Sequence, residues 1–490
     1  MTDNIIVIGG GLGGLTAGAL LSKQGKKVTL IEQHNIVGGY ATTFQRKGFK
    51  VEVGLHEMDG LHKTDSKRKI FEELDVFDNV EFIKAPQFYT FKKGNLEIEI
   101  PDNVEKAKEV LFNIFPDEKK AINKFFHKII KIGDEVERLP NLNKKWKMIL
   151  IAPFLPILFS NMIFSSKDTV GSFLDSITKN NDLKLVLTGN LAYYHDNPYE
   201  LSLQYFAVAQ SSYFKGGGHF VKGGSQNLSN HFRDIILKNG GDIILKNLVT
   251  EIIIKDDKAV GVKYRQNRTS EIKTMFAKNI IFNGAIPNLE NMLPDTEKKL
   301  VLNKSANWQL SPSNITLYLG FDKPLKDLGS TSYSTMFLSE NTQFGDSIEN
   351  TLNLCDYSQI DSGLSSSDKS FAVLVQIDYI KNWENLSKDE YKKAKVEKIE
   401  ELLSKLESKI PNIRKHIIYS ELATPKTNER YTLNKNGAIY GFAQLPNQAF
   451  LNRIQVRSEI PNLFYASAWT MPGGGFTGAI LSGYFASLEI

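Results

Sequence analysis

Three glycines and one acidic residue near the start of the chain have the types and spacing needed to bind a dinucleotide. Gly9, Gly11 and Gly14 follow one short apolar run, and Glu32 ends a second apolar run. In this pattern Gly9 permits a tight turn, Gly11 lets a pyrophosphate approach the backbone, and Gly14 lets a helix pack on a sheet. Glu32 is placed to accept hydrogen bonds from an adenosine ribose.

These residues require a strand, a turn, a helix and a second strand in that order. We expect the strands at residues 5–8 and 28–31 and a helix of small residues at 16–21. The start of that helix would direct unpaired N–H groups and a partial positive charge at the phosphates. Leu12 and Gly13 lie in the same turn and belong to the predicted binding segment.

The length, composition and charge of the chain are those of an ordinary globular protein. The chain has 490 residues, 41% of them hydrophobic and 23% charged, so size alone predicts two lobes. The net charge of +5 comes from lysines interspersed with glutamates. Such a distribution is typical of a solvated surface, and we expect no nucleic-acid partner.

Cysteine and histidine usage excludes other classes of protein. The single cysteine, Cys355, cannot form an internal disulfide, and the eight histidines lack metal-ligand spacing. We therefore expect no metal site. The first predicted strand begins within a few residues of Met1, which leaves no room for a signal peptide, and we expect a reducing, cytoplasmic location.

A second glycine pair extends the pattern toward one family. Gly38 and Gly39 precede the basic residue Arg46 and a predicted strand in which Glu52 is followed by the stretch 54–56, Gly-Leu-His. This order of motifs resembles the flavin-dependent phytoene desaturase, carotenoid isomerase and retinol saturase group. The resemblance implies FAD as the cofactor, with Gly38, Gly39 and Arg46 among the residues that bind it, and covers both ends and a middle portion, about half the chain.

The resemblance also assigns residues far from the start. Residues 463–466 and a small-residue helix from about 477 resemble the strand and helix of the family's C-terminal flavin motif, and Val249 matches a position whose backbone contacts the adenine half of FAD. Ser467–Trp469 depart from the glycine that many relatives carry, which puts contacts to the ribityl chain in doubt. The predicted flavin-facing residues at this end are Gly473, Gly474, Gly475, Phe476 and Thr477.

His56 and Glu57 are the candidates for catalytic groups beside the flavin ring, although His56 is equally compatible with a hydrogen bond to backbone. We expect FAD to be noncovalent, because Cys355 lies outside every flavin motif and no histidine sits in a recognised attachment sequence. Tyr193, Tyr194 and His195 are candidates either for a substrate tunnel or for a packed aromatic cluster.

The predicted fold class is α/β, with a Rossmann-type FAD-binding domain assembled from discontinuous segments and an α+β substrate domain. We assign residues 1–95, 205–300 and 445–490 to the FAD-binding domain. Residues 96–204 and 301–444 then form the substrate domain. No second dinucleotide fingerprint follows a strand, so a separate nicotinamide domain is not expected.

One uncharged stretch, residues 148–166, is flanked by lysines and approaches the length of a membrane span. Pro153, Pro156 and Asn161 argue against a single straight helix in hydrocarbon. Two interpretations remain open: a wedge that docks peripherally on a membrane, or a buried helical hairpin.

Together these features predict an FAD-dependent oxidoreductase that acts on carbon–carbon double bonds of a long hydrophobic polyene or unsaturated lipid, by desaturation, saturation or isomerisation. The absence of an obvious hydrolytic triad or carboxylate pair fits a flavin enzyme, whose cofactor supplies the redox chemistry. Two alternatives remain: a flavin amine oxidase, and a non-enzymatic chaperone of prenylated proteins with a related fold.

Overall fold

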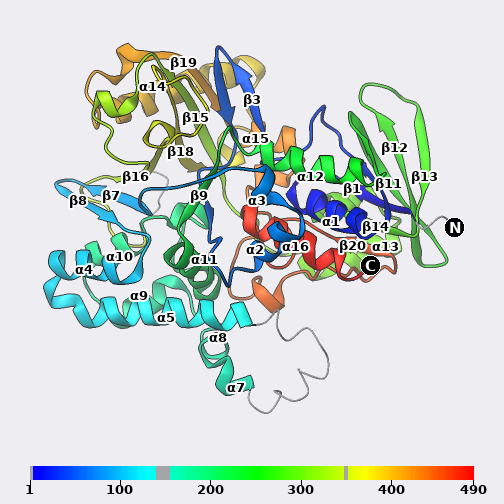
Figure 1. The fold of residues 1–490 in the computed structure, drawn as a ribbon, viewed down its shortest axis with the longest axis horizontal. Helices are drawn as coiled ribbons and strands as arrows, with labels where there is room; N and C mark the ends of the chain where they lie inside the picture. The colour runs from blue at the N-terminus through cyan, green and yellow to red at the C-terminus, as the bar shows by residue number, and fades with distance from the viewer. Residues whose placement is uncertain (1–3, 139–154, 347–350) are drawn as a thin grey trace.

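The computed structural model describes residues 4–138, 155–346 and 351–490. Two β-sheets lie at opposite ends of the molecule and a group of helices joins them below (Figure 1). The N- and C-terminal ends of the described chain both lie beside the same sheet.

That sheet has the topology of a dinucleotide-binding fold. All neighbouring strands are parallel, and the strand order places β1 at the centre. Three distant parts of the chain contribute, which confirms the predicted Rossmann-type domain built from discontinuous segments. The strands in order are β10 (Asp242–Ile244), β2 (Lys27–Ile31), β1 (Asn4–Ile8), β14 (Asn279–Phe282) and β20 (Leu463–Tyr465).

Helix α1 (Leu12–Lys23) packs between α12 (Gln226–Lys238) and α16 (Gly475–Ser487). The contact with α16 is closer than a side chain allows, because a Cβ on Gly483 would lie 2.3 Å from the carbonyl oxygen of Gly13. The first and last helices of the domain are thereby held together. Beside them an antiparallel sheet is formed by β11 (Asn247–Lys255), β12 (Lys258–Gln266) and β13 (Ile272–Phe276).

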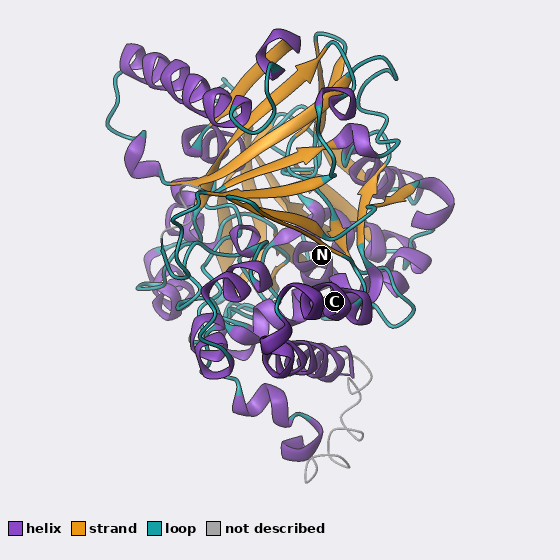
Figure 2. Ribbon diagram, turned by 90° about the vertical axis from the view of Figure 1, so that its left-hand side faces the viewer, coloured by secondary structure: helices purple, strands orange, loops and turns teal. Residues whose placement is uncertain are grey.

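The second large sheet separates an apolar face from a polar one. On β15, Ile315, Leu317 and Leu319 pack with α14 (Lys388–Glu407), whereas the residues between them face the opposite side. Figure 2 shows the strands of this sheet crossing the upper part of the molecule. Their order is β19 (Ile417–Ala423), β15 (Ser313–Phe321), β18 (Ser370–Asp378), β17 (Leu352–Asp356), β16 (Ser334–Leu338), β7 (Tyr89–Lys93) and β8 (Leu96–Ile100).

A helical layer completes the second lobe. Phe125 and Phe126 of α5 (Lys119–Arg138) belong to its buried core. A small sheet connects this layer with the rest, in the order β5 (Met58–Asp59), β9 (Gly218–Val221) and β6 (Phe82–Lys84). The helices are α4 (Val104–Ile114), α5 (Lys119–Arg138), α9 (Val170–Ile177), α10 (Asn181–Leu187) and α11 (Leu203–Gly216).

The structure moves two of the expected domain boundaries. Strand β7 pairs with β16 and with β8, so the chain enters the substrate domain before Tyr89 rather than after residue 95. Helix α11 packs on α5, and its Phe206 and Phe214 belong to the helical core, so residues 205–216 also lie in the substrate domain. The division into two domains otherwise stays as proposed.

The wedge at residues 148–166 is only partly visible, because residues 148–154 lie outside the described part of the chain. Helices α7 (Leu155–Leu158) and α8 (Ser160–Phe164) follow and project below α5 in Figure 1. Among the described residues, no helix is long and apolar enough to cross a bilayer.

One buried arginine joins the C-terminal part of the FAD-binding domain to the loop before it. The Arg453 side chain is 0% exposed and donates to the carbonyl oxygens of Tyr440, Phe442, Gln448, Ala468 and Thr470 at 3.0–3.4 Å. Burial lowers the pKa of Arg453 to about 10, so the guanidinium stays charged at neutral pH.

We expect Arg453→Met to lower the free energy of unfolding by about 3 kcal/mol, because buried carbonyl groups lose their donors. The matched control is Arg457→Met, whose side chain is 67% exposed and pairs with Glu489 at the surface, and which should cost less than about 1 kcal/mol. Urea titration followed by tryptophan fluorescence measures both. Equal losses would contradict the role given to Arg453.

Candidate functional site

One cavity of about 1000 Å³ runs between the two domains. It extends from the glycine turn after β1 to the polar face of the large seven-stranded sheet. This volume lies at the upper end of the range for small-molecule sites, so it has room for a long cofactor and a second molecule. The predicted residues that line it are Gly9, Gly11, Leu12, Gly13, Glu32, Gly38, Gly39, His56, Glu57, Val249, Gly473, Gly474, Gly475, Phe476 and Thr477.

The glycine turn has the shape that a pyrophosphate requires. Gly9 has a φ of +96°, and a Cβ on Gly11 would meet only the side-chain amide of Asn283, at 2.9 Å. Gly11 also precedes α1 as its N-cap without a side-chain hydrogen bond to the helix. The first N–H groups of α1 are therefore available to an anion, and the segment fits FAD.

The second glycine pair packs directly on the first. The Gly38 N–H donates to the carbonyl oxygen of Gly10 at 2.7 Å, and Gly38 and Gly39 have φ values of +130° and +60°. A Cβ on Gly38 would lie 2.3 Å from the carbonyl oxygen of Ala41. Both glycines are thus required by backbone geometry at the edge of the cavity.

The carboxylate of Glu32 is largely buried and already holds two backbone groups. It accepts from the Gly10 N–H at 2.6 Å and from the His34 N–H at 2.8 Å. Both contacts fix the turn that carries the glycines. Because Glu32 also lines the cavity, the same carboxylate can accept a ribose hydroxyl through its remaining lone pairs.

The C-terminal glycine segment forms the opposite wall. A Cβ on Gly474 would lie 2.6 Å from the Cβ of Tyr440, so only glycine fits there. Thr477, in the first turn of α16, donates its hydroxyl to Asp59 on β5. This bond connects the end of the chain to the strand that follows His56 and Glu57.

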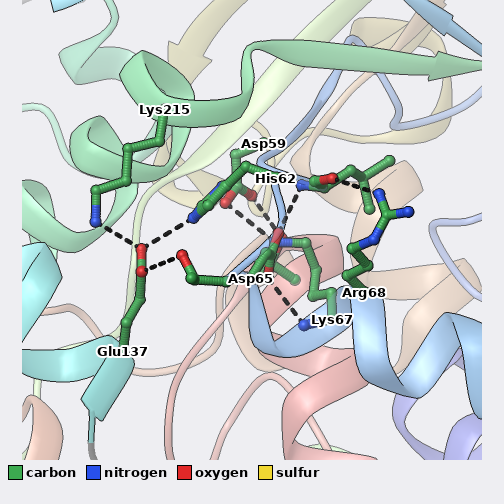
Figure 3. A network of polar contacts seen from close by, with 10 residues as sticks. Asp59, His62, Asp65, Lys67, Arg68, Glu137 and Lys215 are labelled. Carbon is green, nitrogen blue, oxygen red and sulfur yellow. Dashed lines mark hydrogen bonds and ion pairs between the residues drawn. The ribbon is translucent and has the colours of Figure 1, made fainter.

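Asp59 belongs to a buried ion cluster (Figure 3). The Lys67 ammonium, 1% exposed, lies 3.3 Å from Asp59 and 2.8 Å from Asp65, and Asp65 accepts from the Leu61 N–H at 2.6 Å. Burial by itself would raise the pKa of Asp59, but Lys67 and several hydrogen bonds hold it below its ordinary value. Asp59 is therefore a fixed negative charge.

A second polar group in Figure 3 ties the same segment to the helical layer. Glu137 on α5 contacts His62 at 3.0 Å and Lys215 at 2.8 Å and accepts from the Thr64 hydroxyl at 2.7 Å. The segment after β5 is thus attached to α5 and α11 as well as to α16.

His56 is neutral in the site. Its Nδ1 lies 3.2 Å from the hydroxyl of Tyr193, and burial lowers the pKa of His56 to about 4. This hydrogen bond to a cavity-lining tyrosine favours the tunnel interpretation of Tyr193, and Tyr194 lines the same cavity.

Three tyrosines, one on β15 and two beside the ends of β16 and β17, hold the backbone around His56. The hydroxyls of Tyr318, Tyr333 and Tyr357 donate to the carbonyl oxygens of residues 53, 56 and 55, respectively. These three hydrogen bonds fix the conformation of the segment before β5, which the short strand β5 could not fix by itself.

Glu57 is the least satisfied polar group of the site. It is 9% exposed, and neither of its carboxyl oxygens has a hydrogen-bond partner within the described chain. Burial, reinforced by the charges of Asp102 and Asp59, raises the pKa of Glu57 well above its ordinary value. Tyr193 and Tyr213 are among the buried groups that interact with this carboxyl group.

The sequence did not single out the polar face of the large sheet. Thr316 and Tyr318 on β15, Asn353 on β17 and Val375 on β18 line the cavity on the side away from α14. The alternation of side chains along residues 313–321 indicates a strand with two unlike faces. It does not indicate which of the two faces meets a ligand.

Two predicted binding residues lie elsewhere. Arg46 is exposed at the end of β3 (Thr43–Arg46), where its guanidinium stacks over Phe44, so it does not reach the cavity. Gly14 does not line the cavity either; a Cβ there would lie 2.4 Å from the carbonyl oxygen of Gly9, so Gly14 serves the packing of the turn, as its spacing predicts.

We expect Gly11→Val to give a folded protein without flavin. Its side chain would displace only the Asn283 amide, yet it would fill the space that a pyrophosphate needs. Gly13→Val is the contrasting variant, because its Cβ would lie 2.0 Å from the carbonyl oxygen of Ala466 and should prevent folding. Circular dichroism reports folding.

Acid precipitation reports the flavin content. Wild-type flavin should appear in the supernatant, since we expect it to be noncovalent. Flavin that stays in the wild-type pellet, or a yellow Gly11→Val protein, would contradict these expectations.

We expect Glu32→Ala to weaken flavin binding by about 1–3 kcal/mol, because the turn and the ribose lose their acceptor. Glu32→Gln keeps one acceptor oxygen and should lose less. Titration of the apoproteins with FAD, followed by flavin fluorescence, measures the difference. Wild-type affinity in Glu32→Ala would show that the carboxylate does not serve the cofactor.

Comparison with known proteins identifies relatives over almost the whole chain. It is 25% identical over 503 residues to prolycopene isomerase 2 of an Oncidium hybrid cultivar, covering 99% of this chain and 83% of the relative. It is 26% identical over 539 residues to the all-trans-retinol 13,14-reductase of Danio rerio, covering 98% and 85%. These relatives confirm the resemblance seen in the sequence.

The solved structure of cyclohexylamine oxidase from Brevibacterium oxydans has the same fold. The TM-score is 0.64 at 14% identity, over 100% of this chain and 98% of that one. The profile described as flavin containing amine oxidoreductase matches residues 12–490. The cavity fits FAD, and the chain is an FAD-dependent oxidoreductase that belongs to the flavin-containing amine oxidoreductase family.

Proposed function

We propose that this oxidoreductase acts on carbon–carbon double bonds of a long hydrophobic polyene or unsaturated lipid. The observation that carries the proposal is the part of the cavity beyond the glycine segments, which is lined by aromatic and aliphatic side chains and by neutral polar groups. The names of the two relatives, a prolycopene isomerase and a retinol reductase, support this substrate class. Residues of this region include Ala192, Tyr193, Tyr194, Val208, Ala209, Tyr213, Val375 and Ile377.

When bound, FAD supplies or accepts the electrons of the reaction. The chain itself supplies the surroundings: Tyr193 orients His56, three tyrosine hydroxyls fix the backbone around it, and Glu57 adds a neutral acid. We propose His56 and Glu57 as the catalytic groups. An amine oxidase is the second candidate, favoured by the family description and by the fold of cyclohexylamine oxidase.

We further propose that α7 and α8 contact a membrane peripherally. Ile157 is 74% exposed and Phe164 is 77% exposed at the projecting end of the helical layer, whereas Phe159 is buried. Glu135 of α5 fixes this end by accepting from the Asn161 and Met162 N–H groups at 3.1 and 2.8 Å. A rigid, projecting apolar tip fits insertion into the headgroup boundary better than a buried hairpin does.

Anionic liposomes test the membrane contact. We expect the double variant Ile157→Asp with Phe164→Asp to bind them at least about 100-fold less tightly than wild type, since two apolar side chains no longer leave water. It should keep its FAD. The matched control changes Ile272 and Phe276 of β13, 59% and 63% exposed, to Asp and should bind like wild type. Wild-type protein that does not bind the liposomes would contradict the proposed membrane contact.

Turnover of separate panels tests the substrate class. We expect the pure holoenzyme, with oxidised or chemically reduced FAD, to convert a carotenoid, retinoid or unsaturated fatty acid, followed by absorbance and mass. A product that has lost two hydrogens indicates desaturation, one that has gained two indicates saturation, and an unchanged mass with a shifted spectrum indicates isomerisation. Turnover of amines alone, with hydrogen peroxide released, would contradict the proposal.

A further inference from the structure

A short segment of the substrate domain, residues 429–436, leaves its own sheet and reaches the FAD-binding domain. Both of its ends are fixed at the start of β15. The Asn428 amide donates to Oδ1 of Asn314 at 2.9 Å, and the Ser313 hydroxyl donates to the carbonyl oxygen of Gly437 at 2.7 Å. Because both anchors lie on adjacent residues of one strand, the segment between them is a closed excursion from the sheet. We call residues 429–436 the strap.

The strap accepts hydrogen bonds from the FAD-binding domain beside Glu32. The His34 ring N–H donates to the carbonyl oxygen of Tyr431 at 2.5 Å, and the Asn288 amide donates to that of Leu433 at 2.9 Å. All of these residues line the central cavity. Glu32 marks the ribose end of the cofactor site, because the acid after the second strand of a dinucleotide-binding unit accepts from ribose hydroxyls. The strap therefore lies at the adenosine end of the cavity.

A third hydrogen bond comes from the C-terminal part of the FAD-binding domain. The indole N–H of Trp469, a side chain that is 2% exposed, donates to Oδ1 of Asn434 at 3.0 Å. Between these contacts Leu433 has a φ of +57°, a left-handed conformation that is uncommon for leucine. Such a conformation persists only where the surroundings fix it, and it points to a functional constraint on the segment.

The strap is a thin wall of the cavity. Tyr431 is 51% exposed and Leu433 is 39% exposed, although both residues line the cavity. The strap is thus held to the FAD-binding domain by hydrogen bonds and not by burial of its large side chains. Segments with few buried apolar contacts open at a lower free energy than the core does. The strap can therefore open while β15 and the FAD-binding domain stay folded.

We propose that the strap retains FAD: it closes over the adenosine end of the bound cofactor, and FAD enters and leaves while the strap is open. Opening breaks the hydrogen bonds donated by His34, Asn288 and Trp469 and leaves both anchors on β15 intact. The inference concerns the cofactor and not the substrate. It goes beyond the proposed function and does not depend on it.

The rates of FAD uptake and release test the proposal. Asn288→Ala removes one donor to the strap, so uptake by the apoprotein and release from the holoenzyme should both become about 2–10-fold faster, the effect of one lost hydrogen bond. Asn434→Ala removes the acceptor of Trp469 and should act in the same way. The matched control is Asn452→Ala, which removes an exposed bond to the Pro446 carbonyl oxygen outside the cavity and should leave both rates unchanged. Flavin fluorescence measures both rates, and circular dichroism reports folding.

Uptake distinguishes the strap from an ordinary contact with FAD. A residue that only contacts the bound cofactor would speed its release when removed and leave its uptake unchanged, because lost contacts act mainly on dissociation. Faster uptake requires that opening limits entry. Folded Asn288→Ala and Asn434→Ala proteins that take up FAD at the wild-type rate would therefore overturn the proposal, even if both release it faster.

Trypsin reports opening of the strap independently of the flavin signal. Arg430 and Lys435 are exposed residues of the strap, and cleavage after them should follow the fraction of open strap. In the apoprotein, Asn288→Ala should raise this cleavage by the same factor as uptake, and saturating FAD should slow it. Cleavage after Lys392 and Lys393 of α14, 65% and 78% exposed, is the internal control and should not respond to FAD. Strap cleavage that FAD does not slow would overturn the proposal.

Discussion

The central cavity depends on a contact between two helices that have no side chain between them. Gly13 on α1 and Gly483 on α16 approach so closely that a Cβ on Gly483 would lie 2.3 Å from the Gly13 carbonyl oxygen. This approach places the glycine turn after β1 opposite the glycines of residues 473–475. Neither segment forms a cofactor site alone, since each supplies one wall. A side chain at the helix contact would separate the walls and open the site.

The second lobe depends on a sheet whose two faces differ in polarity, rather than on a close contact between helices. One face of β15 packs with α14 through leucines and isoleucine, so the sheet is anchored by hydrophobic burial. The other face directs hydroxyl and amide groups at the cavity. Its Tyr318, together with Tyr333 just before β16 and Tyr357 just after β17, holds the backbone that carries His56. The sheet therefore forms one wall of the substrate region and supports the backbone of its candidate catalytic groups.

Charge is distributed unevenly across the site. Asp59 and Lys67 are buried but paired, and their hydrogen bonds tie β5 to α16. His56 is half-buried and Glu57 is buried, and neither has a charged partner of opposite sign among the described residues; burial lowers the pKa of His56 to about 4 and raises the pKa of Glu57 well above its ordinary value. A neutral region of this kind suits a hydrophobic substrate, because transferring an apolar chain into it leaves no ion unsolvated.

Much of this arrangement was predictable from the sequence because local patterns carry it. The apolar runs, the glycines at fixed spacing and Glu32 determined the β1–α1–β2 unit. The resemblance indicated FAD and matched residues at both ends of the chain. Arg46 lies outside the cavity, because a hairpin turns its side chain to solvent and residue type alone does not reveal that direction.

The sequence by itself determined the dinucleotide-binding unit, the α/β class and the cofactor, since each depends on residues close together or on a motif of fixed spacing. Only the tertiary structure decided which face of the large sheet meets the cavity, that β7 and α11 belong to the substrate domain, and that Glu57 has no hydrogen-bond donor among the described residues. Those properties depend on neighbours from distant segments. Burial and hydrogen-bond partners arise when such segments pack, so no local pattern contains them.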